Sequence, residues 1–254
     1  MTELTNSICR MVKSLDERKT RRKEGAFKAE GTKCVTDTLG HFDLRYLFAT
    51  AEWIETHRPL LQGVAADRLQ QVARRDIVRM SSLVTPPDVI AVYDIPVRNL
   101  DVKKASGELV LALDTIQDPG NLGTIIRVAD WFGVHTILCS NETADCFAPK
   151  VIQSTMGSIS RVSLHYGNLR EMIEAVNPGA VYGTFLDGES ITKATLRQTG
   201  IIVIGNEGKG ISGEIEETVT ERLLIPSYPE GQETGESLNA AVATAITLAK
   251  FRGV

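Results

Sequence analysis

The sequence predicts an α/β protein: a parallel sheet flanked by helices, preceded by a small α/β domain. Three observations support this prediction. Apolar runs of strand length alternate with helical patterns along the chain, the run over residues 109–114 is almost continuously apolar, and the stretch over residues 96–106 is polar and contains lysines. We therefore expect domains at residues 1–95 and 107–254, joined by a linker at 96–106.

In the N-terminal domain, short strands and helices are expected to alternate. The helical patterns cover residues 8–23, 32–39 and 53–57. The strand patterns cover residues 26–30, 44–50 and 89–93, the last of them after the rigid bend Thr85-Pro86-Pro87. This order is typical of a small α/β module.

The larger domain has a more regular alternation. Strands are expected at residues 109–114, 135–139, 162–164, 180–185, 201–204 and 223–225. Helices are expected at residues 122–132, 148–157, 169–176, 215–220 and 238–251. Ligands of open parallel sheets bind beyond the carboxyl ends of the strands, so the loops that follow these strands are the candidate sites.

Composition excludes several classes of protein. With 254 residues, 43% of them hydrophobic, the chain can fill a large core, and no apolar stretch approaches the ~20 residues that span a bilayer. The start, MTELTNSICR, has no apolar signal core, so we expect a cytoplasmic protein. The four cysteines and four histidines lack the spacing of zinc ligands, so neither a metal site nor a disulfide framework is expected.

The charge is unevenly distributed although the net charge is −4. Nine lysines and arginines lie between Arg10 and Lys33, against four acidic residues, and a second basic group follows at Arg68, Arg74, Arg75 and Arg79. Such runs fit either a solvated helix face with internal ion pairs or a surface that binds nucleic acid. Composition alone leaves both open.

The first unusual loop is DPGNLGTIIR. Asp118-Pro119-Gly120 forms a turn and Asn121 is a good helix N-cap. Arg127 then falls in the helix interior, within an apolar run. Considered alone, it fits an ion-paired or snorkelling arginine as well as a functional one.

The second loop follows the strand in IIVIGNEGKGISG. Its last six residues fit G-x-G-x-x-G, but Lys209 is followed by Gly210, unlike a Walker loop, and no acidic residue ends the next strand, as a dinucleotide site would require. The third loop, IPSYPEGQETGESLNAAVATAI, contains the helix cap Ser237 and then Asn239. No Ser-His-Asp arrangement is evident, because no histidine follows His165.

Together, these loops resemble the three signature motifs of the SpoU (TrmH-type) family of RNA 2′-O-ribose methyltransferases, of the SPOUT class. The matching stretches are LDTIQDPGNLGTIIRVADWFG, IIVIGNEGKGIS and LLIPSYPEGQETGESLNAAVATAI, and APKVIQSTMGSISRVSL is also similar. The stretch RRKEGAFKAEGTKCV is similar to the small RNA-binding domain that precedes the catalytic domain in many members. The resemblance covers nearly the whole chain.

The resemblance implies a C-terminal trefoil knot, which rules of chain topology would not predict. It also implies a homodimer that binds S-adenosyl-L-methionine and methylates a ribose 2′-hydroxyl of RNA, with ribosomal RNA favoured over transfer RNA. The expected catalytic residues are Arg127, Asn121, Glu207, Ser237 and Asn239, with Arg127 central. Because a guanidinium stays protonated, we expect Arg127 to bind a phosphate and polarise the hydroxyl instead of acting as the base.

The resemblance further assigns binding residues. Backbone groups of the knot loops are expected to bind the cofactor, at Thr184, Gly205, Gly208, Ile225 and Leu238. The basic residues expected to contact RNA are Arg18, Arg21, Arg22, Lys23, Lys28 and Lys33. Two alternatives stay open: an RNA-binding or ribosome-assembly protein with this fold but no turnover, and a nucleotide-dependent oxidoreductase that rests on residues 208–213 alone.

Overall fold

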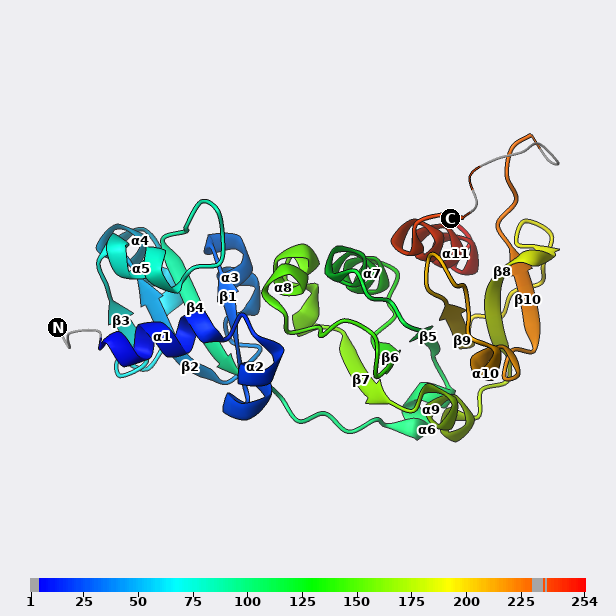
Figure 1. Cartoon of the computed structure of the whole chain (residues 1–254), viewed down its shortest axis with the longest axis horizontal. Helices are drawn as coiled ribbons and strands as arrows, with labels where there is room; N and C mark the ends of the chain where they lie inside the picture. Colours follow the sequence, from blue (N-terminus) through cyan, green and yellow to red (C-terminus); the bar gives the residue numbers. More distant parts are fainter. Residues whose placement is uncertain (1–4, 230–234, 236) are drawn as a thin grey trace. The chain divides into compact units, whose positions relative to one another are not determined.

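The computed structural model describes residues 5–229, 235 and 237–254, and the chain forms two compact units (Figure 1). The N-terminal unit contains Met1–Val97 and Asp145–Ser160; the C-terminal unit contains Arg98–Ala144 and Arg161–Val254. The chain passes from the N-terminal unit to the C-terminal unit after Val97, which lies inside the expected linker. The segment Asp145–Ser160, however, belongs to the N-terminal unit, whereas we expected it in the larger domain.

The N-terminal unit is built on a four-stranded sheet with the order β1-β4-β2-β3, in which β4 is antiparallel to both neighbours and β3 is parallel to β2. The strands are β1 (Ala26–Glu30), β2 (Leu44–Ala49), β3 (Leu69–Gln71) and β4 (Val89–Asp94). The helices are α1 (Asn6–Ser14), α2 (Arg18–Glu24), α3 (Thr32–Thr38), α4 (Ala51–Thr56), the 3-10 helix η1 (Arg58–Leu61), α5 (Arg74–Met80), α8 (Pro149–Thr155) and the 3-10 helix η2 (Ser158–Ser160).

Strand β1 explains why the segment Asp145–Ser160 packs here. The Phe27 ring is fully buried, and its centroid lies 4.6 Å from that of Phe147 and 5.4 Å from that of Tyr93. The thiol of Cys34 also points to the carbonyl of Ile152 in α8. Sequence periodicity places α8 as a helix but cannot assign it to a domain, because an apolar helix face fits either core.

The single helix expected at residues 8–23 is two helices, α1 and α2. The buried side chain of Arg21 donates hydrogen bonds from Nη1 to the carbonyls of Leu15 and Asp16, at 2.8 and 2.9 Å. These carbonyls lie in the break between the two helices. The arginine thereby satisfies acceptors that have no partner inside a helix.

The C-terminal unit contains a six-stranded sheet with the order β10-β8-β9-β5-β6-β7, and all its paired strands are parallel. The strands are β5 (Leu109–Leu113), β6 (Thr136–Ser140), β7 (Ser163–Gly167), β8 (Val181–Ser190), β9 (Gly200–Ile204) and β10 (Glu221–Leu224). Every residue of β5, β6 and β9 is buried, as expected for strands covered on both faces.

Helices cover both faces of this sheet (Figure 1). Helices α7 (Pro119–Trp131) and α11 (Ala240–Arg252) pack together on one face. Helices α6 (Val102–Ser106), α9 (Leu169–Val176) and α10 (Gly213–Glu216) lie on the other. The prediction of a parallel sheet flanked by helices is therefore confirmed, and α6 adds a helix at the end of the expected linker.

The trefoil knot stays a prediction, because residues 230–234 and 236 of the relevant loop lie outside the described residues. Among the helices that the structure describes, none combines the length and hydropathy needed to cross a membrane.

Candidate functional site

A cavity of about 580 Å³ opens at the carboxyl ends of β9 and β10, beside the middle of β8. Its walls come from residues 184–187, from residues 204–211 and from the third loop, at Ile225, Ser237 and Leu238. All five positions expected to bind the cofactor line this one cavity, namely Thr184, Gly205, Gly208, Ile225 and Leu238. The fold thus brings together residues that are up to 54 positions apart (238 − 184).

The turn after β9 is organised by Asn206. Its Oδ1 accepts hydrogen bonds from the backbone N–H groups of Gly208 and Lys209, at 3.0 and 3.1 Å, and its Nδ2 donates to the carbonyl of Thr115 at 2.9 Å. The N–H of Gly210 donates to the Asn206 carbonyl at 2.8 Å. Asn206 was missed from the sequence, although its place at a strand end, beside Glu207, was a usable signal.

These hydrogen bonds bear on the G-x-G-x-x-G match. A phosphate-binding loop needs backbone N–H groups directed at its ligand. Here the N–H groups of Gly208, Lys209 and Gly210 bond to Asn206, and that of Ser212 bonds to the carboxylate of Asp114 at 2.7 Å. The backbone N–H groups of this turn therefore bond to acceptors within the chain and are not directed at a phosphate. This removes the basis of the oxidoreductase alternative.

Gly205 is needed for a close approach of two chain segments. A Cβ at this position would lie 2.4 Å from the carbonyl carbon of Gly210 and 2.4 Å from the nitrogen of Ile211. Both atoms belong to the backbone, so neither can move away as a flexible side chain could. Any larger residue would force the turn, and with it the cavity wall, into another shape.

Four of the five expected catalytic residues form one hydrogen-bonded network. The side-chain amide of Asn121, in the first turn of α7, donates to Oε1 of Glu207 and accepts from Nδ2 of Asn239 at 2.9 Å. The hydroxyl of Ser237 donates to the backbone carbonyl of Glu207 at 3.0 Å. Glu207 and Ser237 also line the cavity. The three loops therefore meet at a polar cluster on the edge of the cavity.

Arg127 lies apart from this network within the chain. It is exposed on α7, not facing a core as its apolar neighbours suggested, and it is not among the residues that line the cavity. No hydrogen bond or ion pair joins it to another residue in the described part of the chain. Its guanidinium is therefore free to bind an external anion.

The cations expected to contact RNA divide into two groups. Arg18, Arg22, Lys23 and Lys33 are exposed, and Lys33 pairs with Asp37 at 2.7 Å. Arg21 and Lys28, by contrast, are 2% and 1% exposed. Nη2 of Arg21 lies 2.6 Å from the carboxylate of Asp145. The burial of these two side chains contradicts the expectation that they contact RNA.

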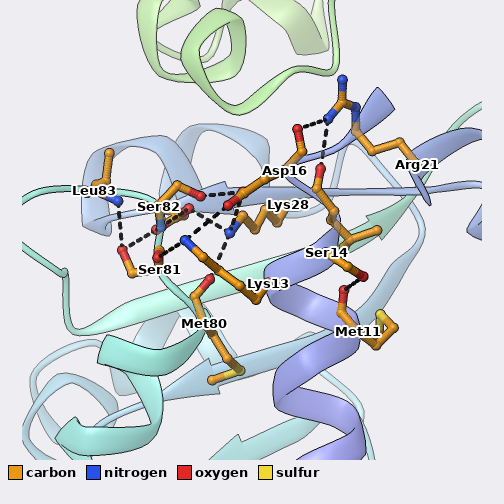
Figure 2. Close-up of polar contacts among 12 residues, drawn as sticks. Met11, Lys13, Ser14, Asp16, Arg21, Lys28, Met80, Ser81, Ser82 and Leu83 are labelled. Atoms are coloured by element: carbon orange, nitrogen blue, oxygen red, sulfur yellow. Dashed lines mark hydrogen bonds and ion pairs between the residues drawn. The ribbon is translucent and has the colours of Figure 1, made fainter. Parts of the chain in front are cut away.

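Lys28 is the centre of a buried polar cluster in the N-terminal unit (Figure 2). Its ammonium lies 2.7 Å from the carbonyl of Met80, 2.9 Å from Asp16 Oδ1 and 3.1 Å from Glu30 Oε1. Glu30 in turn accepts hydrogen bonds from the hydroxyl of Ser81 and the backbone of Ser82. Every residue of β1 is buried, so both faces of this strand are covered and Lys28 lies in the interior, which a count of basic residues cannot reveal.

The titration of Asp16 reflects its place in this cluster. Burial opposes its ionisation, but hydrogen bonds from Ser82, Lys28 and Lys13 and the charge of Lys28 outweigh that effect and lower the pKa of Asp16. The carboxylate is thus held ionised by the groups that it pairs with.

The four cysteines are reduced and buried, and burial raises the pKa of the Cys34 thiol to about 12, so it stays protonated. Within the described residues, no group of three or more His, Cys, Asp or Glu side chains could hold a metal ion.

Comparison with known proteins covers both units. Residues 108–249 match the model of the SpoU rRNA Methylase family, and residues 6–91 match that of the MRM3-like substrate binding domain. The chain is 30% identical, over 95% of its length and 94% of the relative, to the 23S rRNA (guanosine(2553)-2'-O)-methyltransferase RlmP of Bacillus subtilis.

Two solved structures are similar over nearly the full chain. The SpoU methyltransferase AviRb from Streptomyces viridochromogenes, in complex with AdoMet, has a TM-score of 0.85 and 25% identity, with 98% of this chain and 97% of that chain covered. The AdoMet-bound rRNA methyltransferase from Sinorhizobium meliloti has a TM-score of 0.83 and 28% identity, with 99% and 96% covered.

Proposed function

The chain belongs to the SpoU rRNA Methylase family, and from this premise we propose that it methylates a ribose 2′-hydroxyl of ribosomal RNA with S-adenosylmethionine as methyl donor. The observation that carries the proposal is the meeting of all three loops at one cavity, with the Asn121, Glu207, Ser237 and Asn239 network at its edge. With this substrate, we expect the protein to act in the cytoplasm.

The cavity fits the methyl donor in size and chemistry. Its volume of about 580 Å³ lies in the ordinary range for a bound small molecule. Glycines and apolar side chains, such as Gly205, Ile225 and Leu238, line much of it, which suits a flat adenine ring and hydrogen bonds to backbone atoms. When bound, S-adenosylmethionine supplies an activated methyl group, and no metal ion is needed.

Glu207 has the environment of an orienting acceptor. Asn121 donates to Oε1, and Ser237 fixes the backbone carbonyl of the same residue, so the carboxylate is held in place. Its Oε2 has no hydrogen-bond partner in the described part of the chain and is free to accept the ribose hydroxyl. A carboxylate so placed orients the hydroxyl, and a neighbouring phosphate or water takes the proton.

Arg127 supplies positive charge. A guanidinium stays protonated at neutral pH, so we assign it to binding the RNA phosphate and stabilising negative charge that develops on the ribose oxygen. Arg127 does not line the cavity of its own chain, so this assignment requires that another molecule place the Arg127 guanidinium close to the acceptor ribose. A second copy of the chain is the candidate.

A homodimer is supported by an exposed apolar face on α7 and α11. Trp131 is 84% exposed, and Val242 and Ile246 are 47% and 39% exposed, which is unusual for large apolar side chains on two packed helices. Arg127 lies one helical turn before Trp131, so a copy that covers Trp131 also lies against Arg127. The dimer would thus place this guanidinium at an interface, within reach of the partner's cavity.

Mixed dimers test this arrangement. An Arg127→Ala chain keeps an intact cavity, and a Gly205→Ala chain keeps Arg127 but has a distorted cavity. If Arg127 acts across the interface, mixing the two inactive variants restores part of the activity. No recovery in mixed dimers, verified by differential tags, would contradict action across the interface.

Exposed cations on α2 support RNA binding by the N-terminal unit. Arg18, Arg22 and Lys23 have no ion-pair partner among the described residues, so their charges are available for phosphates. We therefore retain these three, with Lys33, as the proposed RNA contacts.

The experiment that tests the function is methyl transfer to ribosomal RNA in vitro, followed by mapping of 2′-O-methyl sites. Arg127→Ala should reduce transfer at least a hundredfold and leave S-adenosylmethionine binding within about twofold, because one charge-stabilising group is lost. Arg170→Ala is the matched control, since Arg170 is a partly exposed arginine on α9 whose ion pairs within the described residues are those with Glu174 and Glu217. RNA binding without transfer by the wild type would favour the non-catalytic alternative.

A further inference from the structure

One wall of the cavity is formed where the pairing of the neighbouring strands β8 and β10 is interrupted. On β10, Arg222 pairs with Gly183 of β8, but the next residue, Leu223, pairs with Glu189. Residues 184–188 of β8 therefore bulge out of the ladder without a partner on β10. Four of these five residues, at positions 184–187, line the cavity.

One glycine directly precedes this bulge and another is its last residue, and both allow close contacts. A Cβ at Gly183 would lie 2.4 Å from the ring of Phe185, and a Cβ at Gly188 would lie 2.7 Å from the carbonyl oxygen of Arg222. The bulge is thus folded back tightly, with the Phe185 ring packed against Gly183, which precedes it, and the Arg222 backbone packed against Gly188, its last residue.

The side chain of Arg222 connects this bulge to the end of α10. Its guanidinium carbon lies 3.6 Å from the centroid of the Phe185 ring. Nη2 lies 2.6 Å from Oδ1 of Asp187, and Nη1 lies 2.5 Å from Oε1 of Glu216, at the end of α10. All three partners line the cavity, whereas Arg222 itself does not.

We propose that Arg222 is a positioning residue for the methyl donor, holding the bulge at residues 184–188 in the shape that completes the cavity. The inference rests on the proposed function. Arg222 suits this role because a planar guanidinium can stack its face on a ring while the nitrogens at its edge bond two carboxylates, whereas an ammonium has no planar face to stack. It also neutralises Asp187 and Glu216, which would otherwise repel each other across the wall.

The expected effect is moderate, because these contacts are partly exposed. The side chain of Arg222 is 37% exposed, and exposed ion pairs and cation–π contacts are individually weak. Loss of two ion pairs and one ring contact should weaken S-adenosylmethionine binding about five- to tenfold. Chemistry should be spared, because none of the catalytic network bonds to Arg222.

The test is calorimetric titration of the full-length chain with S-adenosylmethionine, together with methylation kinetics. Arg222→Met should raise the dissociation constant and the KM for S-adenosylmethionine about five- to tenfold, with kcat within about twofold of the wild type. Arg222→Lys should have an intermediate effect. The matched control is Arg170→Met, which removes a partly exposed arginine of the same unit that also bonds two carboxylates, and it should leave both constants unchanged.

A double-mutant cycle keeps the inference testable if Arg222→Met does not fold. Asp187→Asn removes one ion pair at an exposed position, and its effect should be smaller in an Arg222→Lys background than in the wild type. Additive effects, wild-type affinity in Arg222→Met, or a loss confined to kcat would overturn the inference. Failure of the wild type to bind S-adenosylmethionine would instead refute the proposed function.

Discussion

Replacing Lys28 by methionine should destabilise the N-terminal unit strongly. The Lys28 ammonium is fully buried and lies within 3.1 Å of three acceptors, two of them carboxylates. Methionine removes the charge but leaves Glu30, whose side chain is 3% exposed, without its counter-charge. Removing one partner of a buried ion pair costs about 3–5 kcal/mol in the free energy of unfolding.

The second carboxylate limits this loss and suggests a rescue. Glu30 keeps its hydrogen bonds from Ser81 and Ser82, and Asp16 is partly exposed, so water solvates part of its charge. Lys28→Met combined with Glu30→Gln removes the uncompensated charge and should recover about 1–3 kcal/mol of the loss.

Urea unfolding followed by tryptophan fluorescence measures the effect. Trp53 lies in the N-terminal unit, is 4% exposed and donates a hydrogen bond to Thr32 at 2.9 Å, so its emission should change on unfolding. Trp131 is already 84% exposed, and Trp131→Phe leaves one reporter. If Lys28→Met lowers the free energy of unfolding by less than about 1 kcal/mol, or if adding Glu30→Gln lowers it further, the buried-charge argument is wrong.

Three further predictions concern acid stability, the cofactor cavity and RNA. Because the pKa of Asp16 is lowered in the folded protein, its stabilising contribution should be present above about pH 4 and lost as pH falls further. In urea titrations at a series of pH values, Asp16→Asn should reduce this acid-dependent loss of unfolding free energy, whereas Asp67→Asn, at an exposed position, should not. Gly205→Ala should weaken S-adenosylmethionine binding more than about tenfold in calorimetry because the new Cβ meets backbone, while Gly213→Ala, with open space around it, should not. Arg22→Gln should lower the slope of log affinity for RNA against log salt by about one, and Lys28→Met should leave that slope unchanged at a temperature where it is folded.

Much of the fold could be predicted from local patterns. The strand β1 has the expected bounds, and the apolar runs gave β5 and β9 to within one residue. The prediction of one long first helix was wrong. Arg21 donates hydrogen bonds to carbonyls at a break between two helices, and sequence periodicity does not reveal this break. Helix α5 was missed, since its arginines suggested only a basic surface.

Part of the candidate site could also be predicted, because short sequence motifs identify its residues. Asn121, Glu207, Ser237 and Asn239 were selected by resemblance, and the structure places them in one network. Their hydrogen bonds could not be predicted, because the partners lie 86 to 118 positions apart along the chain for the bonds to Asn121. The same applies to Arg222, an ordinary surface residue in sequence, which contacts residues of the cavity wall only because β10 pairs with β8.

The sequence by itself determined the alternation of strands and helices, the family and the chemical types present, because these depend on local periodicity and short motifs. Tertiary structure alone decided which charges face water. Arg22 and Lys28 are both basic residues of one run, yet Arg22 is exposed on α2 and Lys28 is enclosed by Asp16, Glu30 and Met80. The physical reason is that a charge is buried only when distant segments supply its partners, and those partners meet only in the folded chain.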